Sequence, residues 1–151
     1  MAQEFQLVRA DIRNWQELLG LARAFHLEDE HPLSAAGETA LTESLEISPY
    51  VKTWLMKAGD ATCGYAVVTY GYSIEFGGLT AYLDDFYVLP EFRGRGIGRR
   101  ALDTFERMAK KEKCCIFHLE VQAGNSKARD FYLKRGFADT GRALLIKKLA
   151  E

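Results

Sequence analysis

The sequence predicts an α+β fold, a mixed and mostly antiparallel sheet flanked by about four helices. Two observations lead to this prediction. Strand-like runs separated by turn signals fill the middle of the chain, and strand-like and helix-like runs then alternate to its end. Such an order is typical of a sheet that starts antiparallel and gains a parallel strand through a helical crossover. With 151 residues, 48% hydrophobic and 27% charged, the chain is expected to form one domain over 1–151.

The first fifty residues predict one short strand and two helices. Residues 5–8 indicate a short opening strand, and Asp11 is a good N-cap for a helix over 12–25, where apolar residues recur at helical spacing. The ionisable segment that follows is expected to end this helix. A second helix around 41–45 should stop before Pro49, because the residue before a proline is disfavoured in the helical region.

Three strand-like runs come next. Residues 51–56 and 63–70 flank Gly59-Asp60, a plausible turn of an antiparallel hairpin. The run over 80–88 is rich in aromatic and β-branched residues and follows a second turn signal, Gly77-Gly78. These runs predict the antiparallel part of the sheet.

The last third of the chain predicts a helix over 96–113, a strand over 115–121, a helix from Asn125 or Ser126 to Gly136, and a final strand over 143–149. The connection from the strand at 80–88 to the strand at 115–121 should be right-handed and these two strands parallel.

Composition excludes several classes of protein. No apolar run approaches the roughly 18–20 residues that cross a bilayer, and the amino terminus does not resemble a secretory signal. Three cysteines, with Cys114 and Cys115 adjacent, argue against a disulfide framework and for a reducing cytoplasm. His26 and His31 stand among acidic residues at no standard zinc spacing, so no metal site is expected. The basic residues near 107–113 suit a helix C-terminus rather than a nucleic-acid surface.

The charges are divided unevenly along the chain. Residues 1–90 hold 13 acidic and 5 basic side chains, whereas 91–151 hold 8 acidic and 15 basic ones. This asymmetry could reflect ligands of opposite sign that meet at one site, or simply charges on solvated faces.

The most informative segment is a glycine-rich loop between the strand at 80–88 and the next helix. Gly94, Gly96 and Gly98 alternate with other residues, and Arg93 and Arg95 stand among them. Glycines let backbone N–H groups approach an anion closely, and a helix amino end adds unpaired donors and a partial positive charge. The segment therefore predicts a diphosphate site.

Other interpretations of this loop fit less well. Its spacing is G-x-G-x-G rather than the G-x-G-x-x-G of a dinucleotide fold, and about ninety residues precede it. A Walker A loop would end in G-K-[ST], which Gly98-Arg99-Arg100 does not supply. A turn with a helix cap explains one glycine but not three interleaved with two arginines.

Two segments carry a resemblance to a known family. Arg93–Gly98 reads R-G-R-G-I-G after the lead-in V-L-P-E-F-R-G of Val88–Gly94. It resembles motif A of the GNAT superfamily of acyl-CoA N-acyltransferases, whose core is [Q/R]-x-x-G-x-[G/A]. Residues 125–137, N-S-K-A-R-D-F-Y-L-K-R-G-F, resemble its motif B, N-x-x-A-x-x-[F/L]-Y-x-x-x-G-F. The resemblance covers residues 51–149 well and the first fifty only by the order of elements.

The resemblance implies the GNAT fold, in which the sheet splits in a V between two central parallel strands, here 80–88 and 115–121. It implies acetyl-CoA as co-substrate, with the pantetheine arm bound along the split like an added strand. It implies no metal. The implied coenzyme-binding residues are Phe86, Tyr87 and Val88 on the strand, Arg93, Gly94, Arg95, Gly96, Ile97, Gly98 and Arg99 in and after the loop, and Asn125, Lys127 and Tyr132.

The implied reaction is direct attack of a primary amine on the thioester through a tetrahedral intermediate. The match is closest to polyamine-type acetyltransferases, whose Leu-Glu-Asp run reads here Leu83-Asp84-Asp85. This implies Asp84 as the base and Asp85 in amine recognition. Consecutive strand residues point to opposite faces, so only one of these two should face the acetyl group unless the strand is distorted. Glu120 is a rival base or a substrate contact, and the acidic segment with Glu28 favours a cationic acceptor.

Tyr132 matches the motif B tyrosine beside the coenzyme sulfur, which implies that its phenol protonates the departing thiolate. A main-chain N–H near Val88 should hold the oxyanion. The sequence thus predicts a cytoplasmic, homodimeric acetyl-CoA-dependent N-acetyltransferase for small cationic, polyamine-like amines, without membrane or nucleic-acid partners. A protein lysine or N-terminal acetyltransferase and a non-catalytic CoA-binding sensor are the alternatives.

Overall fold

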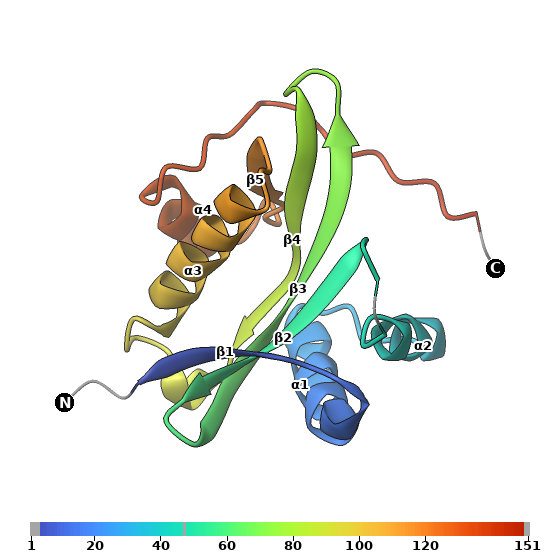
Figure 1. The fold of residues 1–151 in the computed structure, drawn as a ribbon, viewed down its shortest axis with the longest axis vertical. Helices are drawn as coiled ribbons and strands as arrows, with labels where there is room; N and C mark the ends of the chain where they lie inside the picture. Colours follow the sequence, from blue (N-terminus) through green and yellow to red (C-terminus); the bar gives the residue numbers. More distant parts are fainter. Residues whose placement is uncertain (1–3, 47, 150–151) are drawn as a thin grey trace. The chain divides into compact units, whose positions relative to one another are not determined.

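The computed structural model describes residues 4–46 and 48–149. They form two compact units, one up to Leu119 and one from Glu120 onward (Figure 1). The first unit contains β1 (Phe5–Arg9), the 3-10 turn η1 (Ile12–Asn14), α1 (Trp15–Glu28), α2 (Ala35–Glu43), β2 (Val51–Ala58), β3 (Ala61–Ser73), β4 (Gly78–Val88), the 3-10 turn η2 (Pro90–Phe92), α3 (Ile97–Lys111) and β5 (Ile116–Leu119). The second unit contains α4 (Ser126–Leu133).

The sheet has the strand order β1-β2-β3-β4-β5. The first four strands pair antiparallel with their neighbours, and β4 pairs parallel with β5. Glycines with positive φ make the hairpin turns, Gly59 after β2 and Gly77 before β4. The predicted mixed sheet is confirmed, with β3 and β4 longer than their patterns indicate.

One face of the sheet packs against α1 and α2. A helical stripe of apolar residues on α1 meets alternating residues of the three central strands, as period-2 strands and period-3.6 helices require. The buried cluster on this face consists of Ala10, Leu18, Leu21, Ala22, Leu41, Leu55, Tyr65, Val67 and Tyr87. This packing places the end of α1 against β3 and the carboxyl half of β4, where Phe25 contacts Tyr65 and Tyr87.

The opposite face packs against α3, which contacts β1, β4 and β5 (Figure 1). The apolar stripe of α3 is buried, and its other side carries the charges expected of a solvated face. The buried residues of α3 are Ile97, Ala101, Leu102, Phe105 and Ala109. Among the helices that the structure describes, none combines the length and the apolar character that a membrane span needs.

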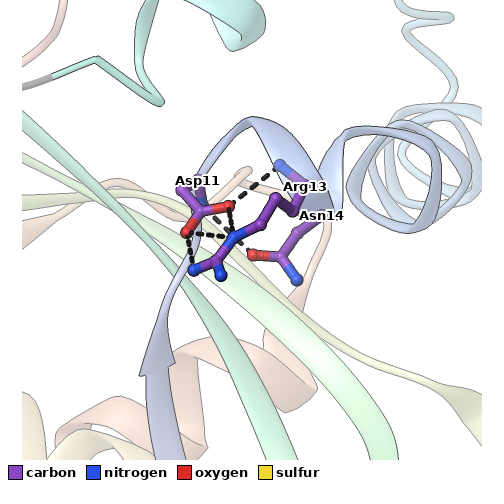
Figure 2. Close-up of polar contacts among 3 residues, drawn as sticks. All are labelled: Asp11, Arg13 and Asn14. Atoms are coloured by element: carbon purple, nitrogen blue, oxygen red, sulfur yellow. Dashed lines mark hydrogen bonds and ion pairs between the residues drawn. The ribbon is translucent and has the colours of Figure 1, made fainter.

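The predicted N-cap at Asp11 is confirmed. The Asp11 carboxylate accepts a hydrogen bond from the backbone N–H of Arg13 (2.9 Å), and the side chain of Asn14 accepts one from the N–H of Asp11 (3.1 Å) (Figure 2). The Arg13 guanidinium also pairs with the Asp11 carboxylate at 2.6 Å. These contacts satisfy N–H groups that a helix start leaves unpaired, and η1 leads directly into α1.

The prediction that the ionisable segment after residue 25 ends the first helix is confirmed, although α1 continues three residues into that segment, to Glu28. His26 and Glu28 make contacts outside the helix that hold the last turn in place: His26 with Asp85 and Glu28 with Arg93. The second helix starts earlier than expected, at Ala35 after the N-cap Ser34, and ends at Glu43.

The predicted final strand over 143–149 is wrong, since the structure assigns no strand to these residues. A strand exists only through hydrogen bonds to a neighbouring strand. In the described part of the second unit α4 is the one regular element. The apolar residues of this segment therefore have no strand in the described part of their own unit to pair with.

Gly64 on β3 stands opposite Val88, where β4 passes very close. A Cβ at residue 64 would lie 2.0 Å from the Tyr87 carbonyl oxygen and 2.6 Å from Cε of Met56. We expect Gly64→Ala to lower the free energy of unfolding by about 1–3 kcal/mol, because the backbone would have to move. The matched control is Gly20→Ala on α1, where the space is open, and which should raise stability by up to about 1 kcal/mol. Urea unfolding of both variants measures this, and an unchanged midpoint for Gly64→Ala would contradict it.

Candidate functional site

The sheet opens at the carboxyl end of β4. Pairing between β4 and β5 stops at Leu83 and Leu119, whereas β4 continues to Val88. The N–H of Leu89 donates to the carbonyl of Cys63 at 2.9 Å, so alternate residues of β4 bond to β3. The backbone groups of Phe86 and Val88 therefore point to the other side, where β5 has ended. This open edge is the V-shaped split that the resemblance predicts.

A β-bulge interrupts β4 beside this edge. Val67 stands opposite Asp85 and Val68 opposite Leu83, which leaves Asp84 as the additional residue between them. A bulge breaks the alternation of side chains and bends the strand, and bulges are common next to functional sites. The strand is thus distorted at the Asp84-Asp85 pair. The side chains of these two residues are therefore not forced to opposite faces of the sheet, as they would be in a regular strand. Asp84 is exposed and Asp85 is half-buried.

Asp85 is the centre of a polar cluster that we call the Asp85 cluster: His26, Tyr65 and Asp85. The Tyr65 hydroxyl donates to Oδ2 of Asp85 at 2.7 Å, and Nε2 of His26 lies 3.1 Å from the same oxygen. Tyr65 is fully buried, whereas the side chains of His26 and Asp85 are 24% and 16% exposed. The ring of Phe25 packs edge-on against both His26 and Tyr65. The cluster is therefore rigid at its base and open to solvent at its top.

The charges around the cluster change the proton affinity of two of its members. The hydrogen bond to Asp85 raises the pKa of His26 above 6.5, and the charges of Asp85, Asp29 and Asp84 act in the same direction against an opposing effect of burial. Burial, followed by the charge of Asp85 and the hydrogen bond to it, raises the pKa of Tyr65 far above 10. Tyr65 therefore keeps its hydroxyl proton at any physiological pH and can donate it to Asp85.

The raised pKa of His26 predicts a pH-dependent contribution to stability. The folded state binds the His26 proton more tightly than the unfolded state does, so this contribution is complete below about pH 6.5 and is lost as pH rises through the raised pKa. In Asp85→Asn this dependence should flatten. Unfolding free energies compared between about pH 6 and about pH 8.5 measure the effect. His31→Gln, outside the cluster, is the control, and an equal pH dependence in wild type and Asp85→Asn would contradict the assignment.

The glycine-rich loop has the backbone that its sequence predicts. Gly94 and Gly96 have φ values of 73° and 77°, in the left-handed region that favours glycine, and Gly96 is the N-cap of α3. The N–H groups of Ile97, Gly98 and Arg99 belong to the first turn of α3, where a helix supplies no acceptors for them. No atom lies within 4 Å of a Cβ built at Gly94 or Gly96, so the loop is open on that side.

The guanidinium of Arg93 is engaged within the protein. It forms two contacts with the Glu28 carboxylate, at 2.9 and 2.8 Å, and its Nε donates to the Val88 carbonyl at 2.8 Å. It also lies over the ring of Tyr87. The hydrogen bond from Arg93 lowers the pKa of Glu28. Arg93 thus ties the end of α1 to the loop, and any anion bound here would meet the backbone of the loop first.

The remaining cations of the predicted coenzyme site lie in two environments. The guanidinium of Arg95 lies over the ring of Phe92, and Arg99 is exposed on the first turn of α3. Lys127 is exposed on the first turn of α4 in the second unit.

The other predicted residues of the second unit are placed around α4. Asn125 is the N-cap of α4, and its side chain accepts a hydrogen bond from the N–H of Ala128 at 3.1 Å. Tyr132 lies between the rings of Phe131 and Phe137, and burial raises its pKa to about 12. Its phenol is therefore protonated at neutral pH. Glu120 directly follows β5 in the chain and is exposed.

The structure brings together residues that the sequence did not connect. His26 and Tyr65 were not among the predicted site residues, yet both contact Asp85. A signal for His26 exists in the sequence, because it lies four residues after the buried Ala22 and so continues the inner stripe if the helix is extended. The pairing of Glu28 with Arg93 joins residues 65 positions apart, and no local pattern contains it.

Comparison with known proteins identifies relatives of the chain. The model of the acetyltransferase (GNAT) family matches residues 12–137. The thialysine N-epsilon-acetyltransferase of Sus scrofa is 36% identical over 85 residues, which are 56% of this chain and 49% of that protein. The spermidine/spermine N(1)-acetyltransferase-like protein 1 of Homo sapiens is 32% identical over 82 residues, which are 54% of this chain and 12% of that protein. The chain thus spans about half the length, or less, of these curated relatives.

Solved structures with the same fold cover almost the whole chain. An integron cassette protein from the mobile metagenome of Cole Harbour Salt Marsh is 31% identical with a TM-score of 0.82, over 97% of this chain and 91% of that chain. The aminoglycoside N-acetyltransferase AAC(6')-Iy, solved in complex with CoA, is 15% identical with a TM-score of 0.81, over 99% of this chain and 98% of that chain. The second likeness is one of fold alone.

Proposed function

The chain belongs to the acetyltransferase (GNAT) family, and from that premise we propose that it transfers an acetyl group from acetyl-CoA to a primary amine of a small cationic molecule. The observation that carries the proposal is the arrangement at the end of β4. An open strand edge, a bulge with two carboxylates and a glycine-rich helix start all belong to one continuous stretch of chain, residues 84–98.

The residues at this place fit the coenzyme chemically. The N–H and C=O groups of Phe86 and the N–H group of Val88, whose carbonyl accepts from Arg93, suit the amide groups of a pantetheine arm, which would add to the sheet as a strand does. The loop from Gly94 to Gly98 and the first turn of α3 offer N–H donors and a partial positive charge to a diphosphate. We propose that the residues implied by the family resemblance bind the coenzyme. Within this set, Arg99 and Lys127 would meet its remaining phosphate, and Asn125 and Tyr132 come from the second unit.

The acceptor is proposed to be cationic because the β-bulge beside the open edge carries two acidic residues. Asp84 and Asp85 stand together at the bulge, and negative charge attracts an incoming ammonium. Relatives named for thialysine, spermidine or spermine, and aminoglycosides all act, by their names, on amines. Glu120 and the Glu28 carboxylate, which Arg93 partly neutralises, are proposed as further contacts with the acceptor.

The proposed chemistry requires two proton movements. An alkyl ammonium has a pKa of about 10.4, so its deprotonation at pH 7 costs roughly 4–5 kcal/mol. A base at the site, for which the resemblance implies Asp84, would lower this cost by receiving the proton directly or through water. The leaving sulfur needs a proton, for which the Tyr132 phenol is proposed. A main-chain N–H near Val88 is proposed to hold the oxyanion.

A screen for thiol release tests the proposal. Acetyl-CoA is offered with polyamines, aminoglycosides, amino acids and lysine-containing or N-terminally free peptides, and free thiol is measured with each. Amine-dependent release with the small cations is expected. Release with peptides alone would indicate a protein acetyltransferase. Binding of acetyl-CoA without release by any amine would indicate a sensor, and either result would reject the proposal.

We also propose that the protein is a homodimer that works in a reducing cytoplasm and without nucleic-acid or membrane partners. The three cysteines are free, which agrees with reducing conditions. The dimer rests on the family resemblance alone, and light scattering of the full chain measures it.

A further inference from the structure

We infer that His26 takes the proton from the acceptor amine, and that Asp85 and Tyr65 are the positioning residues that hold its ring for this role. The inference rests on the proposed function and deepens it, because at the same site it assigns the proton-accepting role to His26 in place of Asp84. His26 lies on the last turn of α1, Tyr65 on β3 and Asp85 on β4, so three separate elements converge on one carboxylate oxygen.

The hydrogen bonds of the Asp85 cluster fix the tautomer of His26. Tyr65 donates to Oδ2 of Asp85 and cannot act as an anion there, since burial and Asp85 itself disfavour its ionised form. A carboxylate only accepts hydrogen bonds, so Nε2 of His26, 3.1 Å from the same oxygen, carries a hydrogen. In the neutral ring the lone pair is then on Nδ1. Asp85 therefore prepares His26 as a base in the way that a buried carboxylate orients an imidazole in other enzymes.

The surroundings of His26 suit proton transfer near neutral pH. The groups that face it are Asp84 and Asp85 from β4, Tyr65 from β3 and Asp29 after the end of α1, and the acidic groups raise its pKa above 6.5. A base works best when its pKa lies near the working pH, and imidazole is the side chain closest to that condition. With 24% of its side chain exposed, His26 is accessible to a solute.

The proposed step balances in atoms and charge. The ammonium gives one proton to Nδ1 of His26, and the nitrogen lone pair then forms the bond to the thioester carbon. The C–S bond breaks with its electron pair on sulfur, and the second proton of the nitrogen, passed directly or through the Tyr132 phenol, completes the thiol. His26 releases its proton to water. One amide, one thiol and one solvent proton are formed in each turnover.

Two titrations of the same group test the inference. The pKa of His26 is followed in the protein by NMR, with His26→Gln to assign the signal, and the pH profile of kcat/KM is measured with a small amine. The acidic limb of the profile is expected at the NMR pKa. In Asp85→Asn the NMR pKa of His26 and the acidic limb of the kcat/KM profile should move together to lower pH, because the carboxylate that raises the pKa of His26 is removed. His26→Gln should lose about 100-fold or more in kcat and lose this limb.

Control variants separate a catalytic role from a structural one. His31→Gln, an exposed histidine that contacts the Asp29 carbonyl, should change neither the NMR pKa of His26 nor the profile. Asp84→Asn should lower the pKa of His26 slightly and keep the limb. If Asp84→Asn removes the limb, or if the limb of Asp85→Asn stays while the NMR pKa moves, the inference is overturned. Thermal melting of each variant shows whether it is folded.

Failure of the proposed function and failure of the inferred role of His26 give different experimental results. If wild-type protein transfers no acetyl group to any amine, the proposed function fails, and the NMR titration still reports whether Asp85 holds His26. An NMR pKa of His26 at or below 6.5, unaffected by Asp85→Asn, would overturn the positioning role even in an active enzyme. If the enzyme is active and the pH profile of kcat/KM does not depend on His26, the acetyltransferase proposal stands and the role of His26 as the base is rejected.

Discussion

Tyr132→Phe is expected to lower kcat about 100-fold or more while the KM for acetyl-CoA changes little. The substitution removes one hydroxyl and keeps the ring, so the packing between Phe131 and Phe137 should be preserved. Because burial raises the pKa of Tyr132 to about 12, the phenol is protonated over the whole working range and is available as an acid. Steady-state kinetics with saturating amine measure the effect.

Tyr72→Phe is the matched control for this variant. Tyr72 is an exposed tyrosine near the end of β3, and loss of its hydroxyl should leave both constants unchanged. An unchanged kcat for Tyr132→Phe would reject the acid role. A large rise in the KM for acetyl-CoA at constant kcat would instead assign the hydroxyl to binding.

Gly96→Ala is expected to weaken CoA binding at least about tenfold and to lower the free energy of unfolding by about 1–2 kcal/mol. The stability loss comes from the left-handed backbone at φ 77°, since the space around a Cβ there is open in the protein alone. The loss of affinity has a different cause: a methyl group would stand among the N–H donors that are proposed to meet the diphosphate.

Calorimetric titration with CoA and chemical unfolding separate these two effects. Gly20→Ala, on the exposed side of α1, serves as the control and should bind CoA as the wild type does. If Gly96→Ala loses stability but binds CoA normally, the loop is only a helix start and the diphosphate lies elsewhere.

Much of the fold follows from local patterns. The apolar stripe of α3 and the strand-like runs of β2 and β3 are visible in the sequence, because α3 buries one face and the two strands contain buried apolar runs. The turn at Gly59-Asp60 and the cap at Asp11 also depend on side chains within a few residues. The crossover rule added the parallel pairing of β4 with β5, and the family resemblance added the split between these two strands.

The parts that could not be predicted depend on distant contacts. The last turn of α1 is held by Asp85 and Arg93, which lie about sixty residues away in the chain. The bulge at Asp84 is set by the register with β3, and the register is a property of the strand pair rather than of either strand. The pairing of the Arg93 side chain with Glu28 is another such distant contact, and it leaves the proposed diphosphate contacts of this segment to its backbone N–H groups.

In the segment over 143–149 the sequence predicts a strand that the structure does not contain. Its apolar residues suit a strand, but the propensity of a segment does not supply the neighbour that a strand needs. The site contains residues that the sequence predicts and residues that it does not. Asp84 and Asp85 were found from a motif, whereas His26 became visible only when the helix that carries it was seen to continue.

The central claim, that CoA docks at the open edge of β4 and the start of α3, is tested most directly by backbone amide spectra of the protein titrated with CoA. The account predicts that the amide signals of Phe86, Val88 and residues 94–99 shift together and saturate. Saturating shifts confined to other parts of the chain, or no shifts at any concentration of CoA, would contradict it.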